Sequence, residues 1–241
     1  MTHEDIIRLS DEVPADSEQL GFIKSFRSNA DRELVAFLCA WASNDGTGDI
    51  YAVRKLVEET MGNEPHGYIV AYKEDTESKA YPDASFHRTL TYGNLAALMA
   101  RLHDIIVKCG CIRRAVMESA MRKKNRCTYA HEALCMDFSG GTGLPSRVTN
   151  GSFYRYYLFI YWMVYKLGIW ESAPCQVLLP CDDQTFIRAY DLGLTKKYDA
   201  STLRNAVMLT KKACKIFGDD KFYKLYEVLN LHKDAEVKRI Y

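Results

Sequence analysis

The chain has little proline and glycine, the residues that form the turns of β-rich proteins and are abundant in disordered ones. It has six prolines and fourteen glycines in 241 residues, whereas an all-β sandwich needs a turn signal about every 8 to 12 residues. Apolar residues make up 48% of the chain and charged residues 26%. These proportions exclude a disordered, collagenous or low-complexity chain and favour a compact helical protein.

Long apolar runs and an excess of one charge are also missing. The longest unbroken apolar run is Tyr156–Tyr165, about half of the roughly 20 residues that a membrane-spanning helix needs. The N-terminus carries early acidic residues and no apolar segment before a small-residue cleavage site, so we expect no secretory signal and a cytoplasmic protein. The chain has 32 basic and 31 acidic side chains, which leaves a formal net charge of +1. Any polyanionic partner must therefore be held by a local basic patch.

Cysteine is sparse, and its spacing does not predict a metal site. Eight cysteines are far fewer than a secreted disulfide scaffold carries, so we expect reduced thiols in the core or on the surface. The chain lacks the paired knuckles that preorganise zinc and the four-cysteine spacing of an iron-sulfur cluster. The candidate ligands considered are Cys109, Cys111, Cys127, Cys135, His103 and His131. We expect no metal, no iron-sulfur cluster and no cofactor.

Apolar residues recur at helical spacing along most of the chain, which predicts an all-α fold. Leu34–Trp41 is apolar all round and should form a central buried helix. The other predicted helices lie at Tyr51–Met61, Leu95–Ile106, Arg113–Met121, Phe153–Tyr165, Asp183–Tyr190, Leu203–Phe217 and Phe222–Leu229. Ser139–Ser152, with four glycines and a proline, predicts a long loop, and Gln176–Leu179 is the one short strand candidate.

Well-known catalytic motifs are missing. Gly140–Gly143 has neither the Lys-Ser/Thr pair of a phosphate-binding loop nor a preceding strand. The chain has no G-x-S-x-G elbow and no H-E-x-x-H helix. The sequence therefore argues against the nucleotide-binding and hydrolase classes that these motifs mark.

The segment Leu179–Arg188 allows two interpretations. Asp182 is a good N-cap for a helix over Asp183–Tyr190, because its side chain can accept backbone N–H groups at the helix start. A carboxylate fixed at a helix N-terminus could also stabilise a developing cation or orient a water molecule.

The same segment resembles part of an uncharacterised bacterial family that is similar to the helix-hairpin-helix DNA glycosylases of the endonuclease III class. The family's Pro-Leu-Asp-Thr-His…Leu-Gly-Leu…Arg-Lys…Asp stretch is matched by Pro180-Cys181-Asp182, Asp191-Leu192-Gly193-Leu194, Lys196-Lys197 and Asp199. Upstream blocks that match are Leu144-Pro145-Ser146, Gly151-Ser152, Arg155, Trp162-Met163-Val164 and Gly168-Ile169-Trp170. The resemblance covers about residues 20 to 230.

The resemblance implies a fold and a domain arrangement. The fold would be all-α, with two helical lobes around a cleft, as in helix-hairpin-helix glycosylases. The chain would form one glycosylase-like unit, with residues 1–30 and 185–241 in one lobe and residues 31–184 in the other. The hairpin would lie near residues 149–152.

The resemblance also implies site residues. Alignment on Pro180 places the glycosylase aspartate at Asp182, whereas counting back from Arg188 places it at Asp183, so both are candidate catalytic residues. Phosphates of double-stranded DNA would be held by the hairpin and by nearby basic residues, namely Asn150, Gly151, Ser152, Arg155, Arg188, Lys196 and Lys197. Trp41, Tyr154 and Tyr157 are the candidate aromatic residues of a base pocket.

One departure of this sequence from the family's pattern bears on the expected chemistry. Tyr154 stands where the family has a lysine that matches the Schiff-base nucleophile of bifunctional glycosylases. Without an amine at that place, strand cleavage by this route is not expected. The resemblance therefore implies a monofunctional DNA N-glycosylase that excises a damaged or mismatched base. We expect a monomer.

Two alternatives remain open at this point. The chain could be a non-catalytic DNA-binding or partner-binding helical module of the same fold, with Asp182 serving only as a helix cap. It could also be a small-molecule enzyme that uses Asp182 and Asp183, although nothing in the sequence indicates the substrate.

Overall fold

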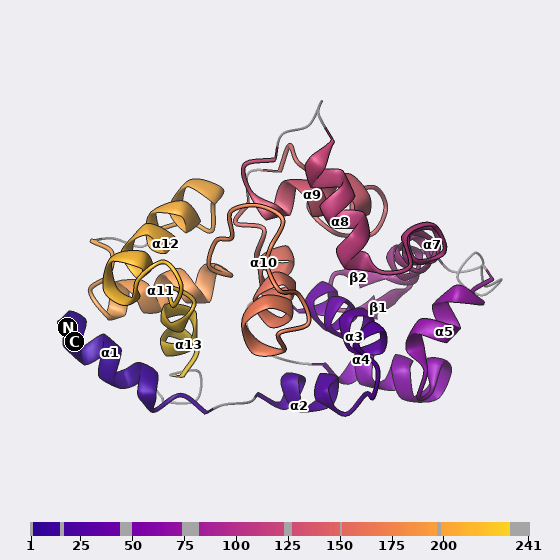
Figure 1. The fold of residues 1–241 in the computed structure, drawn as a ribbon, viewed down its shortest axis with the longest axis horizontal. Helices are drawn as coiled ribbons and strands as arrows, with labels where there is room; N and C mark the ends of the chain where they lie inside the picture. The colour runs from indigo at the N-terminus through magenta and orange to yellow at the C-terminus, as the bar shows by residue number, and fades with distance from the viewer. Residues whose placement is uncertain are drawn as a thin grey trace. The chain divides into compact units, whose positions relative to one another are not determined.

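The structure is a computed structural model that describes residues 2–14, 17–43, 50–73, 82–122, 127–149, 151–196 and 199–231. The described residues form twelve α-helices, two short π-helical stretches and one two-stranded sheet (Figure 1). The prediction of an all-α protein is confirmed at this level. In the described part of the chain, no helix is both long enough and apolar enough to span a membrane.

The chain divides into two compact units. Unit 1 comprises Met1–Ser17, Asn150–Tyr154 and Leu178–Tyr241, and unit 2 comprises Glu18–Thr149 and Arg155–Val177. These boundaries differ from the lobes expected from the sequence at residues 18–30, 150–154 and 178–184. The reason lies in local packing: α2 (Glu18–Lys24) packs on α3 (Asn29–Ala42) inside unit 2, and Ser152 bonds to Cys181 inside unit 1.

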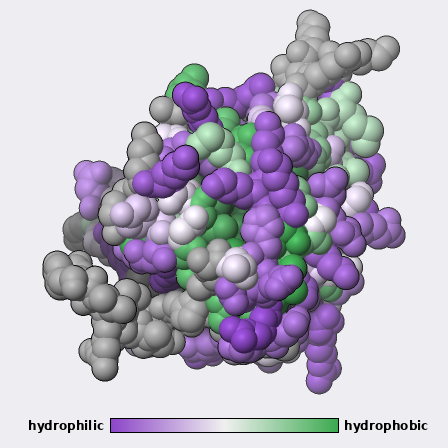
Figure 2. All heavy atoms as spheres, turned by 90° about the vertical axis from the view of Figure 1, so that its left-hand side faces the viewer, coloured by the Kyte–Doolittle hydropathy of each residue, from purple (hydrophilic) through white to green (hydrophobic). Residues whose placement is uncertain are grey.

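Unit 1 is built from the two ends of the chain. Its helix α1 packs against α12 and α13, and α11 packs against α13 (Figure 1). The bounds of its helices are α1 (His3–Asp11), α11 (Asp183–Asp191), α12 (Leu203–Phe217) and α13 (Lys224–Leu231). Figure 2 shows hydrophilic residues over much of the face turned to the viewer, with hydrophobic residues between them.

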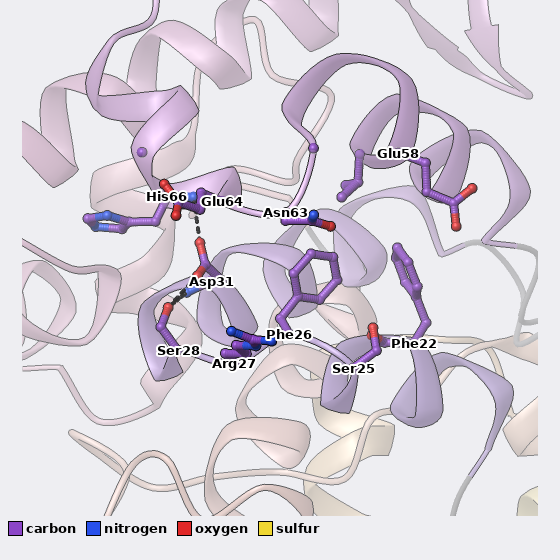
Figure 3. A pocket seen from close by; sticks show the side chains of 13 residues that line it. Phe22, Ser25, Phe26, Arg27, Ser28, Asp31, Glu58, Asn63, Glu64 and His66 are labelled. Atoms are coloured by element: carbon purple, nitrogen blue, oxygen red, sulfur yellow. Dashed lines mark hydrogen bonds between the residues drawn. The ribbon is translucent and has the colours of Figure 1, made fainter.

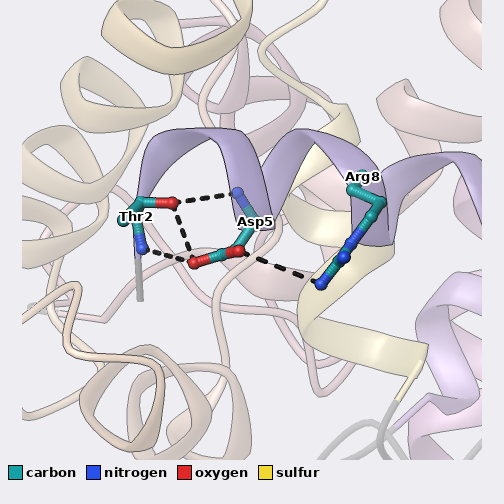
Figure 4. A network of polar contacts seen from close by, with 3 residues as sticks. All are labelled: Thr2, Asp5 and Arg8. Carbon is teal, nitrogen blue, oxygen red and sulfur yellow. Dashed lines mark hydrogen bonds and ion pairs between the residues drawn. The ribbon is translucent and has the colours of Figure 1, made fainter.

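The first helix has a complete N-terminal cap (Figure 4). The Thr2 hydroxyl accepts the Asp5 backbone N–H at 3.2 Å, and the Asp5 carboxylate accepts the Thr2 N–H at 2.9 Å. The hydrogen bonds from Thr2 and the nearby Arg8 lower the pKa of the Asp5 carboxyl. Because the cap satisfies N–H groups that a helix start leaves unpaired, α1 begins at His3.

Unit 2 contains the larger core. Its elements are α2 (Glu18–Lys24), α3 (Asn29–Ala42), α4 (Tyr51–Leu56), the π-helical η1 (Val57–Met61), α5 (Pro65–Val70), β1 (Ser85–His87), β2 (Leu90–Thr91), α7 (Tyr92–Cys109), α8 (Ile112–Met121), α9 (Ala130–Phe138), α10 (Tyr154–Tyr161) and the π-helical η2 (Trp162–Lys166). The first residue of α10 is grouped with unit 1. All predicted helical segments are confirmed, but those over Tyr51–Met61 and Phe153–Tyr165 each pass from an α-helix into a π-helical stretch.

Helix α3 is the centre of this core, as predicted for Leu34–Trp41. Every residue from Glu33 to Ala42 is buried, and the Phe37 ring contacts Phe138 and Phe159 at 4.3 and 5.0 Å between ring centroids. Two acids on the same helix hold other elements in place. Asp31 accepts the His66 backbone N–H at the start of α5, and Glu33 accepts the Ile112 and Arg113 N–H groups at the start of α8.

Glu33 also accepts a hydrogen bond of 2.7 Å from the indole of Trp170. Burial raises the pKa of the Glu33 carboxyl, and the three hydrogen bonds lower it. A buried acid with this many donors is a structural link between elements that lie far apart in sequence.

The strand prediction was wrong in detail. Gln176 forms only an isolated parallel bridge with Tyr129, whereas the antiparallel pair β1 and β2 lies at residues 85–91, in a segment without strand-like alternation. A two-residue strand gives too short a pattern to be read from sequence. The predicted loop over Ser139–Ser152 is irregular throughout its described residues.

Candidate active site

Asp182 is the N-cap of α11, as predicted. Its Oδ1 atom accepts the Thr185 backbone N–H at 2.7 Å and the Thr185 hydroxyl at 2.6 Å, and the Thr185 hydroxyl oxygen accepts the Asp182 N–H at 3.3 Å. The residue is 6% exposed. These hydrogen bonds run in both directions between Asp182 and Thr185, so they fix the orientation of the carboxylate.

The second oxygen of Asp182 is not used by the cap. Both hydrogen bonds that the carboxylate accepts end on Oδ1. Among the described residues, Oδ2 has no hydrogen-bond donor. An anchored carboxylate with one uncommitted oxygen can accept a hydrogen bond from a water molecule or lie against a developing positive charge.

One predicted hairpin residue, Ser152, lies beside Asp182 within unit 1, whereas Thr149 belongs to unit 2. The Ser152 hydroxyl donates to the carbonyl of Cys181, the residue before Asp182, and lies 2.8 Å from the Ser201 hydroxyl. Phe153, next to Ser152, has a φ of 57°, a left-handed conformation that is uncommon for a bulky residue. Gly151 adjoins this turn, and Asn150 lies outside the described residues.

Two tyrosines complete what we call the Asp182 cluster. The Tyr154 and Tyr226 hydroxyls are 3.5 Å apart. Burial raises the pKa of the Tyr226 hydroxyl, the bond with Tyr154 lowers it, and the Asp182 carboxylate raises it further. The cluster consists of Ser152, Tyr154, Cys181, Asp182, Thr185, Ser201 and Tyr226. Burial and Asp182 also raise the pKa of the Cys181 thiol, so neither that thiol nor Tyr226 is a ready source of protons at neutral pH.

The sequence did not single out Ser201 or Tyr226. Tyr226 belongs to the apolar face predicted for the last helix, and nothing in its local pattern separates a core tyrosine from one beside a carboxylate. Asp183, the other candidate catalytic residue, is the first residue of α11 and is exposed.

The two predicted DNA-binding arginines are engaged inside the protein. Arg188 donates to the Leu229 carbonyl at 2.7 Å, near the end of α13. In unit 2, Arg155 donates to the Ser43 carbonyl at 2.9 Å and to the Gly143 carbonyl at 3.1 Å. These bonds bind loops and helix ends together. Lys196 is exposed after α11, and Lys197 lies outside the described residues.

Two of the three predicted base-pocket residues are enclosed in unit 2. The Trp41 indole donates to the Thr142 carbonyl at 2.7 Å and stacks on Phe86. The Tyr157 hydroxyl shares a hydrogen bond of 2.6 Å with Nδ1 of His131. Trp41 is 1% exposed and Tyr157 0%, whereas Tyr154 is half-buried and lies in the Asp182 cluster.

A large pocket in unit 2 was not anticipated from the sequence (Figure 3). It has a volume of about 930 Å³ and lies between residues 22–31 and 57–67. The Phe22 and Phe26 rings meet edge to face in its wall. Asp31, which also lines it, already accepts hydrogen bonds from the Ser28 hydroxyl and the His66 N–H, so this carboxylate serves the fold.

The cysteines and histidines do not assemble into a metal centre in the described part of the chain. There, no three His, Cys, Asp or Glu side chains lie together in a way that could hold an ion. The eight cysteines are free thiols.

Comparison with known proteins places the chain in a family. The family model described as "Protein of unknown function (DUF2400)" matches residues 19–223, which include every residue of the Asp182 cluster except Tyr226. The chain belongs to this family. No curated protein and no solved structure matches the chain. The DUF2400 match spans both units and ends before α13.

Proposed function

We propose that this DUF2400 protein is a monofunctional DNA N-glycosylase that removes a damaged or mismatched base, with Asp182 as its catalytic carboxylate. The observation that carries the proposal is the geometry of this carboxylate, which is fixed through Oδ1 and has Oδ2 uncommitted. Its neighbour Ser152 belongs to the segment that the glycosylase resemblance assigns to the hairpin.

The chemistry requires an anion at this kind of position. As the bond from the base to the C1′ carbon breaks, positive charge develops on the sugar, and a fixed carboxylate stabilises that charge more than it stabilises the substrate. Oδ2 would face this charge and orient the attacking water. The water adds to C1′, and the base leaves with a proton.

Tyr154 supports the monofunctional form of the reaction. Its hydroxyl lies beside that of Tyr226 in the cluster, at the place where the resemblance assigns a lysine. A phenol does not form a Schiff base with the sugar, so the abasic product would remain unbroken until alkali is added. Tyr154 is also the predicted base-pocket residue that lies in the same cluster as Asp182.

DNA would be held by the backbone amide at Gly151 and by exposed lysines such as Lys196, while the buried Ser152 would fix the turn beside them. Arg155 and Arg188 would position these segments through their carbonyl contacts. Few direct phosphate contacts imply a modest salt dependence of binding.

The test uses duplexes that each carry one damaged or mismatched base, followed by alkali. We expect strand breaks only after alkali with the natural protein. Asp182→Asn should lower base release at least about 100-fold while keeping the helix cap, because asparagine caps helices as well as aspartate does. Asp183→Asn is the matched control, since it removes the same charge one residue away on the exposed surface, and it should release base at the natural rate.

A second candidate is a non-catalytic DNA-binding or partner-binding module of the same fold. It is favoured by the capping box, which by itself accounts for the burial of Asp182, and by the internal use of both arginines. Salt-sensitive duplex binding without base release from any substrate would favour this candidate. Equal activity of the Asp182→Asn and Asp183→Asn variants would refute Asp182 as the catalytic group.

A further inference from the structure

Helix α12 of unit 1 exposes a face on which every charge is positive. Its fifteen residues include one arginine and three lysines but no acidic residue. The buried side of the helix is formed by Ala206, Leu209, Thr210 and Ala213. The exposed residues repeat at helical spacing on the opposite side and are Arg204, Met208, Lys211, Lys212 and Lys215. We call the four basic residues among them the α12 basic face.

The positive charge is concentrated in this part of the chain. Residues 196–221 contain seven basic and three acidic side chains, whereas the whole protein has 32 basic and 31 acidic ones. The rest of the chain is therefore negative on balance. A protein of near-zero net charge can attract a polyanion only through such a local excess of cations.

Three of the four cations are not engaged by the fold. Within the described residues, Arg204, Lys211 and Lys215 form no hydrogen bond and no ion pair, and all three are exposed. Lys212 is different, because its ammonium group donates to the Leu194 carbonyl and so holds the turn after α11.

Acidic side chains near α12 do not neutralise the face. The acids closest in sequence, Asp199 and Asp219, lie before the start and after the end of the helix. The Cys214 thiol donates to the Asp219 carboxylate. On α1, which packs against α12, Asp11 pairs with Lys224.

The α12 basic face lies on the side of the helix away from the chain that leads to Asp182. On the buried side, the Thr210 hydroxyl accepts the Leu179 backbone N–H at 3.0 Å, three residues before Asp182. The basic face is therefore a surface distinct from the Asp182 cluster, and contacts made there do not touch the carboxylate.

We propose that the α12 basic face binds the phosphate backbone of double-stranded DNA, whatever its sequence. The choice of DNA rests on the proposed function, whereas the binding itself needs no base release. Arg204 and Lys215 are eleven residues apart, which is about 16 Å along a helix. A duplex of that length presents roughly nine phosphate charges, so each free cation can reach one.

The composition of the face suits a nucleic acid better than a protein or a membrane. The cores of protein interfaces are depleted in lysine and enriched in aromatic residues, but this face has three lysines and a single apolar residue, Met208. A helix that lies in a membrane surface inserts its apolar side. In α12 that side is buried in unit 1.

The test measures how tightly the full chain binds an undamaged, labelled duplex of about 20 base pairs, at salt from about 50 to 200 mM. The variant replaces Arg204, Lys211 and Lys215 together by glutamine, which has a similar helix propensity. We expect the slope of log affinity against log salt to become shallower by about 2 to 3. The affinity at the lowest salt should fall about tenfold or more. Circular dichroism and the melting temperature check that the variant is folded.

A second triple variant is the matched control. Arg27→Gln, Lys55→Gln and Lys108→Gln together remove the same residue types from exposed positions in unit 2. This control should keep both the affinity and the salt slope of the natural protein, because its total charge equals that of the α12 variant and only the position of the charges differs.

Base release separates this proposal from the proposed function. At saturating protein, the α12 variant should release the base at the natural rate but need a higher concentration to reach it. Asp182→Asn should do the reverse, binding the undamaged duplex as the natural protein does. If no substrate releases its base, the proposed function fails, whereas duplex binding that depends on the α12 basic face still supports this proposal.

The proposal is overturned if the natural protein does not bind the duplex, or if the two triple variants weaken binding equally. It is also overturned if the α12 variant loses binding to vesicles that contain phosphatidylserine while its duplex binding is unchanged, since the face would then serve a membrane.

Discussion

Acid should destabilise this protein through His131 in particular. His131 is the second residue of α9 and is 3% exposed. Its Nδ1 lies 2.6 Å from the Tyr157 hydroxyl, and its ring stacks on Tyr129. Burial, with a contribution from the charge of Arg147, lowers the pKa of His131 from 6.5 to about 4. The folded protein therefore favours the neutral ring.

The direction and size of the change in unfolding free energy with pH follow from this pKa difference. Because the pKa is lower in the folded chain, the stabilisation is present above pH 6.5 and is lost as the pH falls towards 4. One pKa unit corresponds to about 1.4 kcal/mol, so the loss of unfolding free energy due to His131 should reach about 2 kcal/mol at pH 5 and about 3 kcal/mol at pH 4.

Urea unfolding of the natural protein and His131→Asn, at intervals between pH 7 and pH 4, isolates this contribution. Asparagine can place a polar atom where Nδ1 lies but does not titrate, so the variant should lose about 3 kcal/mol less than the natural protein over this range. An NMR titration of the His131 ring gives a second measurement. The reasoning is refuted if the two proteins lose stability in parallel, or if the ring titrates near pH 6.5.

Three further predictions concern the core and the Asp182 cluster. Glu33→Ala should lower the unfolding free energy, measured by urea unfolding, by about 3 to 5 kcal/mol. The change leaves the Trp170 indole and two N–H groups at the start of α8 without their acceptor. A loss below about 1 kcal/mol would contradict the role of Glu33 as a link. Gly143→Ala should lower the melting temperature and reduce the unfolding free energy by about 1 to 3 kcal/mol. Gly143 has a φ of 73°, and an added Cβ would lie 2.7 Å from Cδ2 of Leu90. An unchanged melting temperature would contradict this prediction. Tyr154→Lys should give strand breaks without alkali and a product trapped by borohydride; base release without such a product would refute the assignment of this position.

Several features of the candidate site could be predicted from the sequence. Asp182 as an N-cap and the helix that follows it are local features, since the capping contacts join residues three positions apart. The loop before α10 was also predictable from its glycines. The engagement of Arg155 by the Ser43 carbonyl was not, because that bond joins residues 112 positions apart.

The amino-acid sequence by itself determined the helical class and the position of nearly every long helix, because helix periodicity and capping are set by neighbours within one or two turns. Tertiary structure alone decided the roles of the polar residues. It made Glu33 a link between α8 and Trp170, enclosed Tyr157 against His131, and brought the Tyr226 hydroxyl to that of Tyr154. These outcomes depend on which surfaces pack together across long stretches of chain, and no local pattern encodes that choice.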